Sequence, residues 1–233
     1  MIPADPHAPH KRERRKQDRP GELLEAALDL FVEKGFAATR VEEVALRAGV
    51  SKGTLFLYFP SKEELFKAVV RENIAGRFSE WNSELETMTG STSDVLRYCY
   101  KVWWERIGCT KASGITKLMF SEAQNFPEIA EFYQQEVIFP GQALIRRILQ
   151  RGIDRGEFRH VPLDGATYLV MVPMIFLMLW ENSMGACSPQ VMGLTPQTYM
   201  DSALDGILHG LCVRPDAALA PATSFTDSPH LPR

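Results

Sequence analysis

The feature that most limits the fold is a pair of short helical segments, 41–48 and 52–58, bounded by residues that stop and start helices. Gly49 ends the first segment, Ser51 can cap the N-terminus of the second, and Pro60 ends it. Two short helices joined by a turn that contains glycine are the pattern of a helix-turn-helix, whose second helix enters the major groove of DNA. Such pairs also occur in ordinary helical bundles, so the spacing alone leaves DNA binding open.

Helical periodicity also covers most of the chain outside this pair. An amphipathic helix precedes it and ends at Gly35, and Ser61 begins a long helix after it. Further helices are predicted over about 93–108, 112–124, 127–155, 163–185 and 196–212. Pro140 and Gly141 either kink or split the 127–155 segment, and the pattern does not decide which. No segment has the alternation of a strand, so the predicted fold class is all-α.

The two ends of the chain differ in composition from its helical part. Residues 11–19 hold six basic and two acidic side chains, and the tail after Arg214 is rich in Ala, Pro and Ser. We expect a disordered basic arm (1–18), a helix-turn-helix DNA-binding domain (19–64), a helical ligand-binding and dimerisation domain (65–213) and a disordered tail (214–233). The net charge of -3 does not itself indicate a nucleic-acid partner, but only the surface that faces phosphate needs to be positive.

The residue types in segment 19–66 carry information beyond the helix-turn-helix spacing. The informative residues are Ala26-Ala27, Leu30-Phe31, Gly35-Phe36, Thr39, Val44-Ala45, Ala48-Gly49-Val50-Ser51, Gly53-Thr54-Leu55, Tyr58-Phe59, Ser61-Lys62-Glu63 and Leu65. With these residues the segment closely resembles the DNA-binding domain of the tetracycline repressor (TetR) family of bacterial regulators. The resemblance covers about a fifth of the chain. It implies a homodimeric cytoplasmic repressor that binds a palindromic operator and is released by a small, largely apolar effector in its C-terminal domain.

The candidate DNA-contacting residues lie at helix starts and along the second helix of the pair. They are Thr39, Arg40, Ser51, Lys52, Gly53, Thr54, Phe56, Leu57, Tyr58 and Lys62. Lys52 can reach a base edge or a phosphate, and Lys62 suits a phosphate because it lies in the first turn of a helix. The family often has tyrosine where this chain has Phe56, so we expect an apolar contact there, for example with a thymine methyl. For Thr39 the alternative is a capping box with Glu42, and for Tyr58 it is packing against the next helix.

The C-terminal part has a surplus of methionine and aromatic residues, which is typical of an adaptable apolar cavity. The candidate pocket residues are Phe78, Trp81, Trp103, Phe120, Phe126, Tyr133, Met171, Met174 and Met178. The alternative for most of them is ordinary core packing. The polar groups that could orient a ligand are Arg106, Glu122, Gln124, Asn125 and Asn182. The segment 163–185 is apolar almost all round, so we expect it to form a dimer interface together with 196–212.

Other functional classes find little support in the sequence. It contains none of the common catalytic or nucleotide-binding motifs, and its cysteines and histidines lack metal-ligand spacing, so we expect no enzyme, no cofactor and no metal site. The most apolar stretch, Tyr168 to Trp180, is too short to cross a membrane. The competing interpretation is a helical small-molecule-binding protein or enzyme whose N-terminal helices are structural. A transcriptional activator of the same family is a closer alternative.

Overall fold

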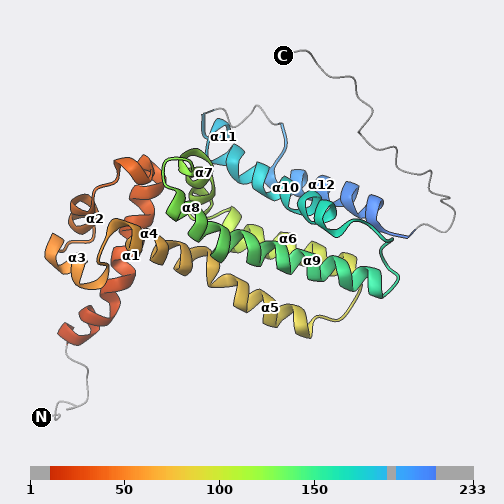
Figure 1. Cartoon of the computed structure of the whole chain (residues 1–233), viewed down its shortest axis with the longest axis horizontal. Helices are drawn as coiled ribbons and strands as arrows, with labels where there is room; N and C mark the ends of the chain where they lie inside the picture. Colours follow the sequence, from red (N-terminus) through yellow and green to blue (C-terminus); the bar gives the residue numbers. More distant parts are fainter. Residues whose placement is uncertain (1–10, 188–192, 214–233) are drawn as a thin grey trace, which may run out of the picture.

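A computed structural model of the chain describes residues 11–187 and 193–213, and every regular element in these ranges is a helix (Figure 1). The all-α prediction is therefore confirmed. The α-helices are α1 (Lys11–Ala38), α2 (Val41–Arg47), α3 (Lys52–Tyr58), α4 (Lys62–Val70), α5 (Arg77–Thr87), α6 (Thr92–Trp103), α7 (Ser113–Glu122), α8 (Pro127–Tyr133), α9 (Phe139–Asp154), α10 (Leu163–Glu181), α11 (Met184–Cys187) and α12 (Pro196–Leu211). Three π-helical turns interrupt them: η1 (Arg71–Ala75), η2 (Trp104–Gly108) and η3 (Gln134–Ile138).

The first helix starts earlier than the sequence pattern predicts. α1 begins at Lys11, so the backbone of residues 11–18 is helical and not part of a disordered arm. This stretch consists mainly of Lys, Arg, Glu and Gln, which favour helices, and Pro20 is accommodated within α1. The predicted disorder of 1–10 and 214–233 lies outside the described residues. The helix kinks at Gly35, whose φ of 83° is in the left-handed region that glycine tolerates.

The helix-turn-helix has two of its three predicted caps. Ser51 Oγ accepts a hydrogen bond from the Thr54 N–H at 3.1 Å, and Ser61 caps α4 in the same way. The predicted capping box of Thr39 and Glu42 is wrong, because α2 starts one residue later, with Arg40 at the N-cap. The Thr39 hydroxyl donates to the Leu30 and Gly35 carbonyl oxygens, at 3.1 and 2.7 Å, and these belong to the kinked end of α1.

The segment 127–155 forms one continuous helical run, with α8, η3 and α9 following one another without a break. The π turn lies directly before the first turn of α9, which contains Pro140. Proline has no N–H to donate, and its ring clashes with the preceding turn of a regular helix. A wider turn at this point lets the chain pass the proline without ending the helix.

The C-terminal domain is built around α10, which packs against α7, α9 and α12 (Figure 1). α1 contacts α4 and α7, so the helix-turn-helix unit rests on the C-terminal helices through these two elements. Within the described ranges, the stretch Leu163–Cys187 is long and apolar enough to cross a membrane by length and composition alone, and it is longer than the sequence pattern predicts. Its packing against three other helices is also what the core helix of a bundle shows.

Candidate functional site

The outer surface of α3 combines one lysine with large apolar side chains. Leu57 is 84% exposed, and Phe56 is exposed beside it. Lys52 Nζ lies 2.7 Å from Glu42 Oε1 of α2 and 5.6 Å from the centre of the Phe56 ring. The hydrogen bond from Lys52 lowers the pKa of Glu42. This pair is exposed, so a DNA phosphate can compete with Glu42 for the Lys52 ammonium group.

The other predicted DNA contacts differ in how accessible they are. Gly53 and Arg40 are exposed, whereas Tyr58 is half-buried against the core. The Thr54 hydroxyl is 2.9 Å from Ser51 Oγ at the start of α3. Thr39 is only 2% exposed, and its hydroxyl is hydrogen-bonded inside the protein. DNA contact by these residues remains a prediction, and Thr39 is the one whose side chain is least available.

Lys62 has a well-defined structural role. Its ammonium group donates to the carbonyl oxygens of Phe36, Ala37 and Thr39, at 2.8, 3.3 and 3.1 Å. It also lies 4.4 Å from the centre of the Phe36 ring, which is a cation–π distance. α4 is thereby joined to the segment between α1 and α2. The predicted phosphate contact of Lys62 therefore has to coexist with these intramolecular bonds.

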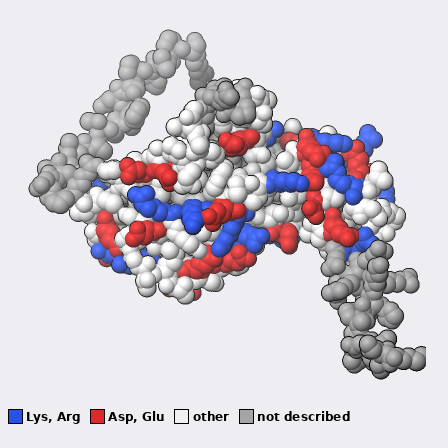
Figure 2. All heavy atoms as spheres, turned by 180° about the vertical axis from the view of Figure 1, so that it is seen from behind, with Lys and Arg blue, Asp and Glu red and all other residues white. Residues whose placement is uncertain are grey.

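Charges around the helix-turn-helix are largely paired. Arg47 of α2 donates to both carboxylate oxygens of Glu33 in α1, at 2.8 and 3.0 Å, and this lowers the pKa of Glu33. Lys34 Nζ of α1 likewise forms an ion pair with Glu43 Oε1 of α2, at 2.8 Å. Figure 2 shows Lys and Arg side chains interspersed with Asp and Glu over the face in view. On this face, phosphate contacts would therefore depend on individual side chains and helix N-termini, because the charges alternate in sign.

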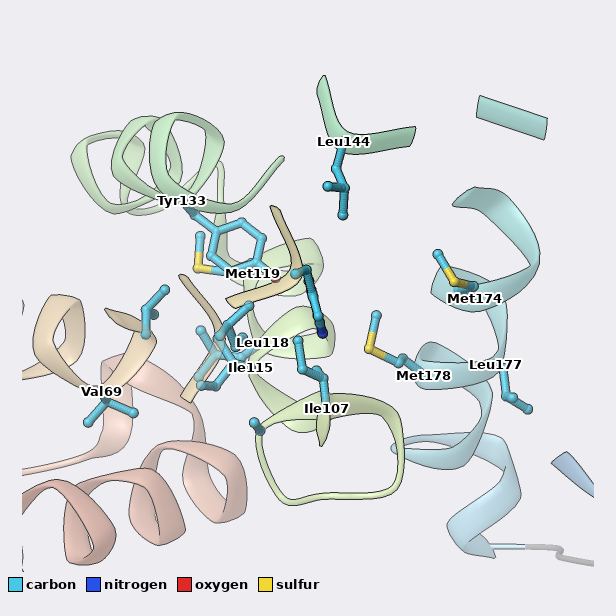
Figure 3. Close-up of a cluster of buried hydrophobic side chains, with 14 of the residues drawn as sticks. Val69, Ile107, Ile115, Leu118, Met119, Tyr133, Leu144, Met174, Leu177 and Met178 are labelled. Atoms are coloured by element: carbon cyan, nitrogen blue, oxygen red, sulfur yellow. The ribbon is translucent and has the colours of Figure 1, made fainter. Parts of the chain in front are cut away.

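The C-terminal helices enclose a cavity of about 540 Å³, a size typical of small-molecule sites. Eight of the nine predicted pocket residues line it: Phe78, Trp81, Trp103, Phe120, Tyr133, Met171, Met174 and Met178. Figure 3 shows Tyr133, Leu144 and Met178 converging from three different helices. The predicted clustering of these residues is thus found, although their contact with a ligand is not tested by their position alone.

Phe126 does not belong to this cavity. It lies just before Pro127, at the N-cap of α8, and its ring packs edge-on against Phe36 with centroids 4.8 Å apart. Phe36 in turn contacts Phe31 and Phe66. Phe126 therefore connects the C-terminal domain to the aromatic core of the N-terminal unit.

All three π turns contribute to the cavity wall. Ile74 comes from η1, Ile107 from η2, and Val137 from η3. π turns are rare and often occur at functional sites, because they redirect side chains that a regular helix would place elsewhere. Their grouping around one cavity supports a binding role for it. The sequence pattern did not indicate these turns.

The polar groups at the cavity are not those that the sequence suggested. Arg106, Glu122, Gln124, Asn125 and Asn182 do not line it. The lining polar residues are instead Glu84, Tyr98, Cys99, Thr116, Tyr133, Gln134, Gln142 and Tyr168.

Most of these lining groups are already hydrogen-bonded. Glu84 accepts from Arg106 Nη2 at 2.7 Å and from the Tyr98 hydroxyl at 3.0 Å, and the Arg106 bond is the main reason that its pKa is lowered. The Thr116 and Tyr133 hydroxyl oxygens are 3.1 Å apart, and burial raises the pKa of Tyr133 to about 12. Glu84 with Tyr98, and Thr116 with Tyr133, thus form two separate polar points in a largely apolar wall.

Glu122 connects the C-terminal domain to the kink in α1. Its carboxylate oxygens accept hydrogen bonds from the backbone N–H groups of Phe36 and Ala37, at 2.9 and 3.0 Å. A Cβ at Gly35 would collide with Glu122 Oε1, so a larger residue there would displace this carboxylate and would also strain the positive φ. The same helix, α7, contributes Thr116 and Phe120 to the cavity. One short helix therefore contacts both the cavity and the segment that leads into the helix-turn-helix.

Comparison with known proteins gives matches to the N-terminal helices and matches to most of the chain. Residues 23–69 match the family of bacterial regulatory proteins described as the tetR family. The chain is 27% identical over 209 residues to the HTH-type transcriptional repressor KstR2 of Mycolicibacterium smegmatis, covering 89% of this chain and 96% of KstR2. It is 50% identical over 62 residues to the HTH-type transcriptional regulator RutR of Escherichia coli (strain K12), covering 27% of this chain and 29% of RutR.

The fold is similar to that of solved regulators over most of its length. The crystal structure of FadR from Bacillus subtilis, in complex with stearoyl-CoA, has a TM-score of 0.61 at 17% identity, covering 82% of this chain and 98% of FadR. The family match is confined to residues 23–69, whereas the similarity in fold to FadR covers 82% of the chain. Together with the helix-turn-helix geometry, these matches show that the chain carries a TetR-family DNA-binding domain and is similar over most of its length to an HTH-type transcriptional repressor. The FadR structure shows that the fold is shared as well.

Proposed function

We propose that the protein is a cytoplasmic repressor that binds a palindromic operator as a homodimer and is released when a small, largely apolar effector occupies the cavity. The observation that carries this proposal is the position of α7, which lines the cavity through Thr116 and Phe120 and holds the end of α1 through Glu122. A ligand that shifts α7 would therefore move the support of the helix-turn-helix.

The proposed dimer uses the outward face of α10. Leu169, Val172 and Phe176 are exposed there at helical spacing, and Val172 is 54% exposed. An apolar face of this kind on a helical bundle favours an interface with a second subunit. α12 packs beside α10 and would complete the interface. A two-fold axis would then set two α3 helices about 34–36 Å apart, the spacing of successive major-groove faces.

Release from DNA requires that the effector bind one conformation more tightly than the other. We infer two routes from the cavity to α3. One passes through α7 and Glu122 to the kink in α1, and the other passes through α5 and η1 into α4, where Lys62 holds the same segment. Both routes meet at residues 35–39, directly before α2.

The test is a titration of labelled DNA, taken from upstream of the protein's own coding sequence, with the purified protein. Binding is measured by fluorescence anisotropy at two salt concentrations. Specific binding should weaken steeply as salt rises, because phosphate contacts release counterions. Lys52→Ala should weaken binding, whereas Lys117→Ala, a change at an exposed position of α7, should not. Affinity that is unmeasurable at low salt, or that does not respond to salt, would refute the proposal.

A further inference from the structure

We propose that the cavity selects uncharged molecules: apolar compounds that carry a hydroxyl or carbonyl oxygen bind, whereas carboxylates and ammonium ions are rejected. This inference rests on the proposed function only in treating the ligand as an effector. It follows from which charges lie on the cavity wall and how each of them is already paired.

An anion finds no counter-charge in the cavity. The described residues that line it include no lysine, arginine or histidine. Most of the wall is aliphatic, aromatic or methionine, including Trp81, Ile145 and Met174. A carboxylate placed against the buried part of this wall would lose its hydration without gaining an ion pair, which strongly disfavours its binding. The wall therefore discriminates strongly against acids in their ionised form.

A cation finds only a carboxylate whose two oxygens are occupied. Glu84 is the one lining residue, in the part of the chain that the structure describes, that carries a full charge at neutral pH. Its Oε1 accepts from Arg106 and its Oε2 accepts from Tyr98. Arg106 does not line the cavity itself, and its Nη1 also lies 3.7 Å from Glu80 Oε2. A ligand cation would have to displace Arg106 or approach a pair that is already neutral, so Glu84 offers it little attraction.

A neutral oxygen does find partners. The Thr116 and Tyr133 hydroxyl groups are buried side by side and can each donate or accept. At the more exposed side of the wall, the Gln142 amide donates to the Tyr168 hydroxyl at 3.0 Å. An alcohol or carbonyl can join either pair without leaving a charge unpaired, while the rest of the molecule fills the apolar space.

The test compares dodecan-1-ol, dodecanoate and dodecyltrimethylammonium, each below its micelle concentration, with the full-length protein at pH 8 and without DNA. Trp81 and Trp103 line the cavity, so tryptophan fluorescence reports binding. The alcohol should bind saturably, and each ion should bind at least about 100-fold more weakly. An ion that binds within about tenfold of the alcohol, or an alcohol that does not bind saturably, overturns the inference.

The substitution Glu84→Gln tests the pairing argument directly. It removes the partner of Arg106 at the cavity wall and so leaves a guanidinium group for an anion to meet. Dodecanoate should then bind at least about tenfold more tightly, while dodecan-1-ol changes by less than about twofold. Glu131→Gln, an exposed change on α8, is the matched control and should alter none of the three affinities. An unchanged ratio of alcohol to acid affinity in Glu84→Gln contradicts the proposal.

Binding and DNA release are measured separately, so the two proposals can fail separately. If dodecan-1-ol binds with the expected selectivity but leaves operator affinity unchanged, the effector function is refuted and the selectivity of the cavity stands. If an ion both binds and releases the DNA, the function stands and the uncharged class is wrong.

Discussion

Replacing Glu122 by alanine should separate the C-terminal domain from the kink in α1. The carboxylate accepts two backbone hydrogen bonds, one from the half-buried Phe36 N–H and one from the exposed Ala37 N–H. A hydrogen bond to a charged group contributes about 1.5–3 kcal/mol, with the exposed one at or below the lower end. We therefore expect Glu122→Ala to lower the free energy of unfolding by about 2 kcal/mol. For a chain of this length that corresponds to a Tm about 4–8 °C lower.

The assay is urea unfolding monitored by circular dichroism. Glu131→Ala is the control, because it also removes a glutamate, here an exposed one. Gly35→Ala supplies the second arm of a double-mutant cycle. The alanine Cβ would collide with Glu122, and the alanine backbone would have to adopt a positive φ. Once Glu122 is removed, only the backbone strain of Gly35→Ala remains, so the double variant should lose less stability than the sum of the single variants. If the two losses add to within about 0.5 kcal/mol, the two residues are not in contact and the reasoning is wrong.

Four further outcomes follow from the same structure. Lys62→Met should lower the free energy of unfolding by about 1–3 kcal/mol without DNA present, because three carbonyl oxygens lose their donor; urea unfolding checks this, and an unchanged midpoint contradicts it. Phe120→Ala should weaken dodecan-1-ol binding by fluorescence but change stability by less than about 0.5 kcal/mol, because the side chain lines the cavity and is 63% exposed. Val172→Asp should convert the proposed dimer to monomer in analytical ultracentrifugation, whereas a variant that stays dimeric would place the interface elsewhere. Burial raises the pKa of Cys99 from 9.0 to about 12, so the unfolded thiol loses its proton first and stability should fall as the pH rises from 9 to 12. Urea unfolding at several pH values should show a smaller fall for Cys99→Ala.

Local chemistry explains why the helix-turn-helix could be predicted from the sequence. Ser51 and Ser61 cap helices through bonds to residues three positions away, and Gly35 kinks α1 through its own positive φ. None of these interactions depends on distant parts of the chain. Thr39 shows the limit of this approach, because its hydroxyl bonds to Leu30 and Gly35 across a kink that a capping pattern does not contain.

The cavity was predictable in composition but not in its polar groups. Aromatic and methionine residues cluster there because they are the bulky apolar residues of the C-terminal helices, so composition alone selects most of them. Which polar side chain faces the cavity depends instead on the rotation of each helix about its axis. Glu122 and Arg106 were predicted to orient a ligand, yet one binds the backbone near Gly35 and the other supports Glu84 from outside the wall.

The π turns explain why helix rotation was not predictable. A regular helix advances each residue by about 100°, so one extra residue in a turn shifts every later side chain by about that angle. The segment from α4 to α5 would present Phe66, Ile74 and Trp81 on one side if it were a single regular helix. In the structure η1 follows Phe66 and contains Ile74: Phe66 packs with Phe31 and Phe36 of the N-terminal helices, whereas Ile74 and Trp81 line the cavity. The segment from α4 to α5 thus packs Phe66 against the N-terminal helices and turns Ile74 and Trp81 toward the cavity, with a π turn that changes its phase on the way.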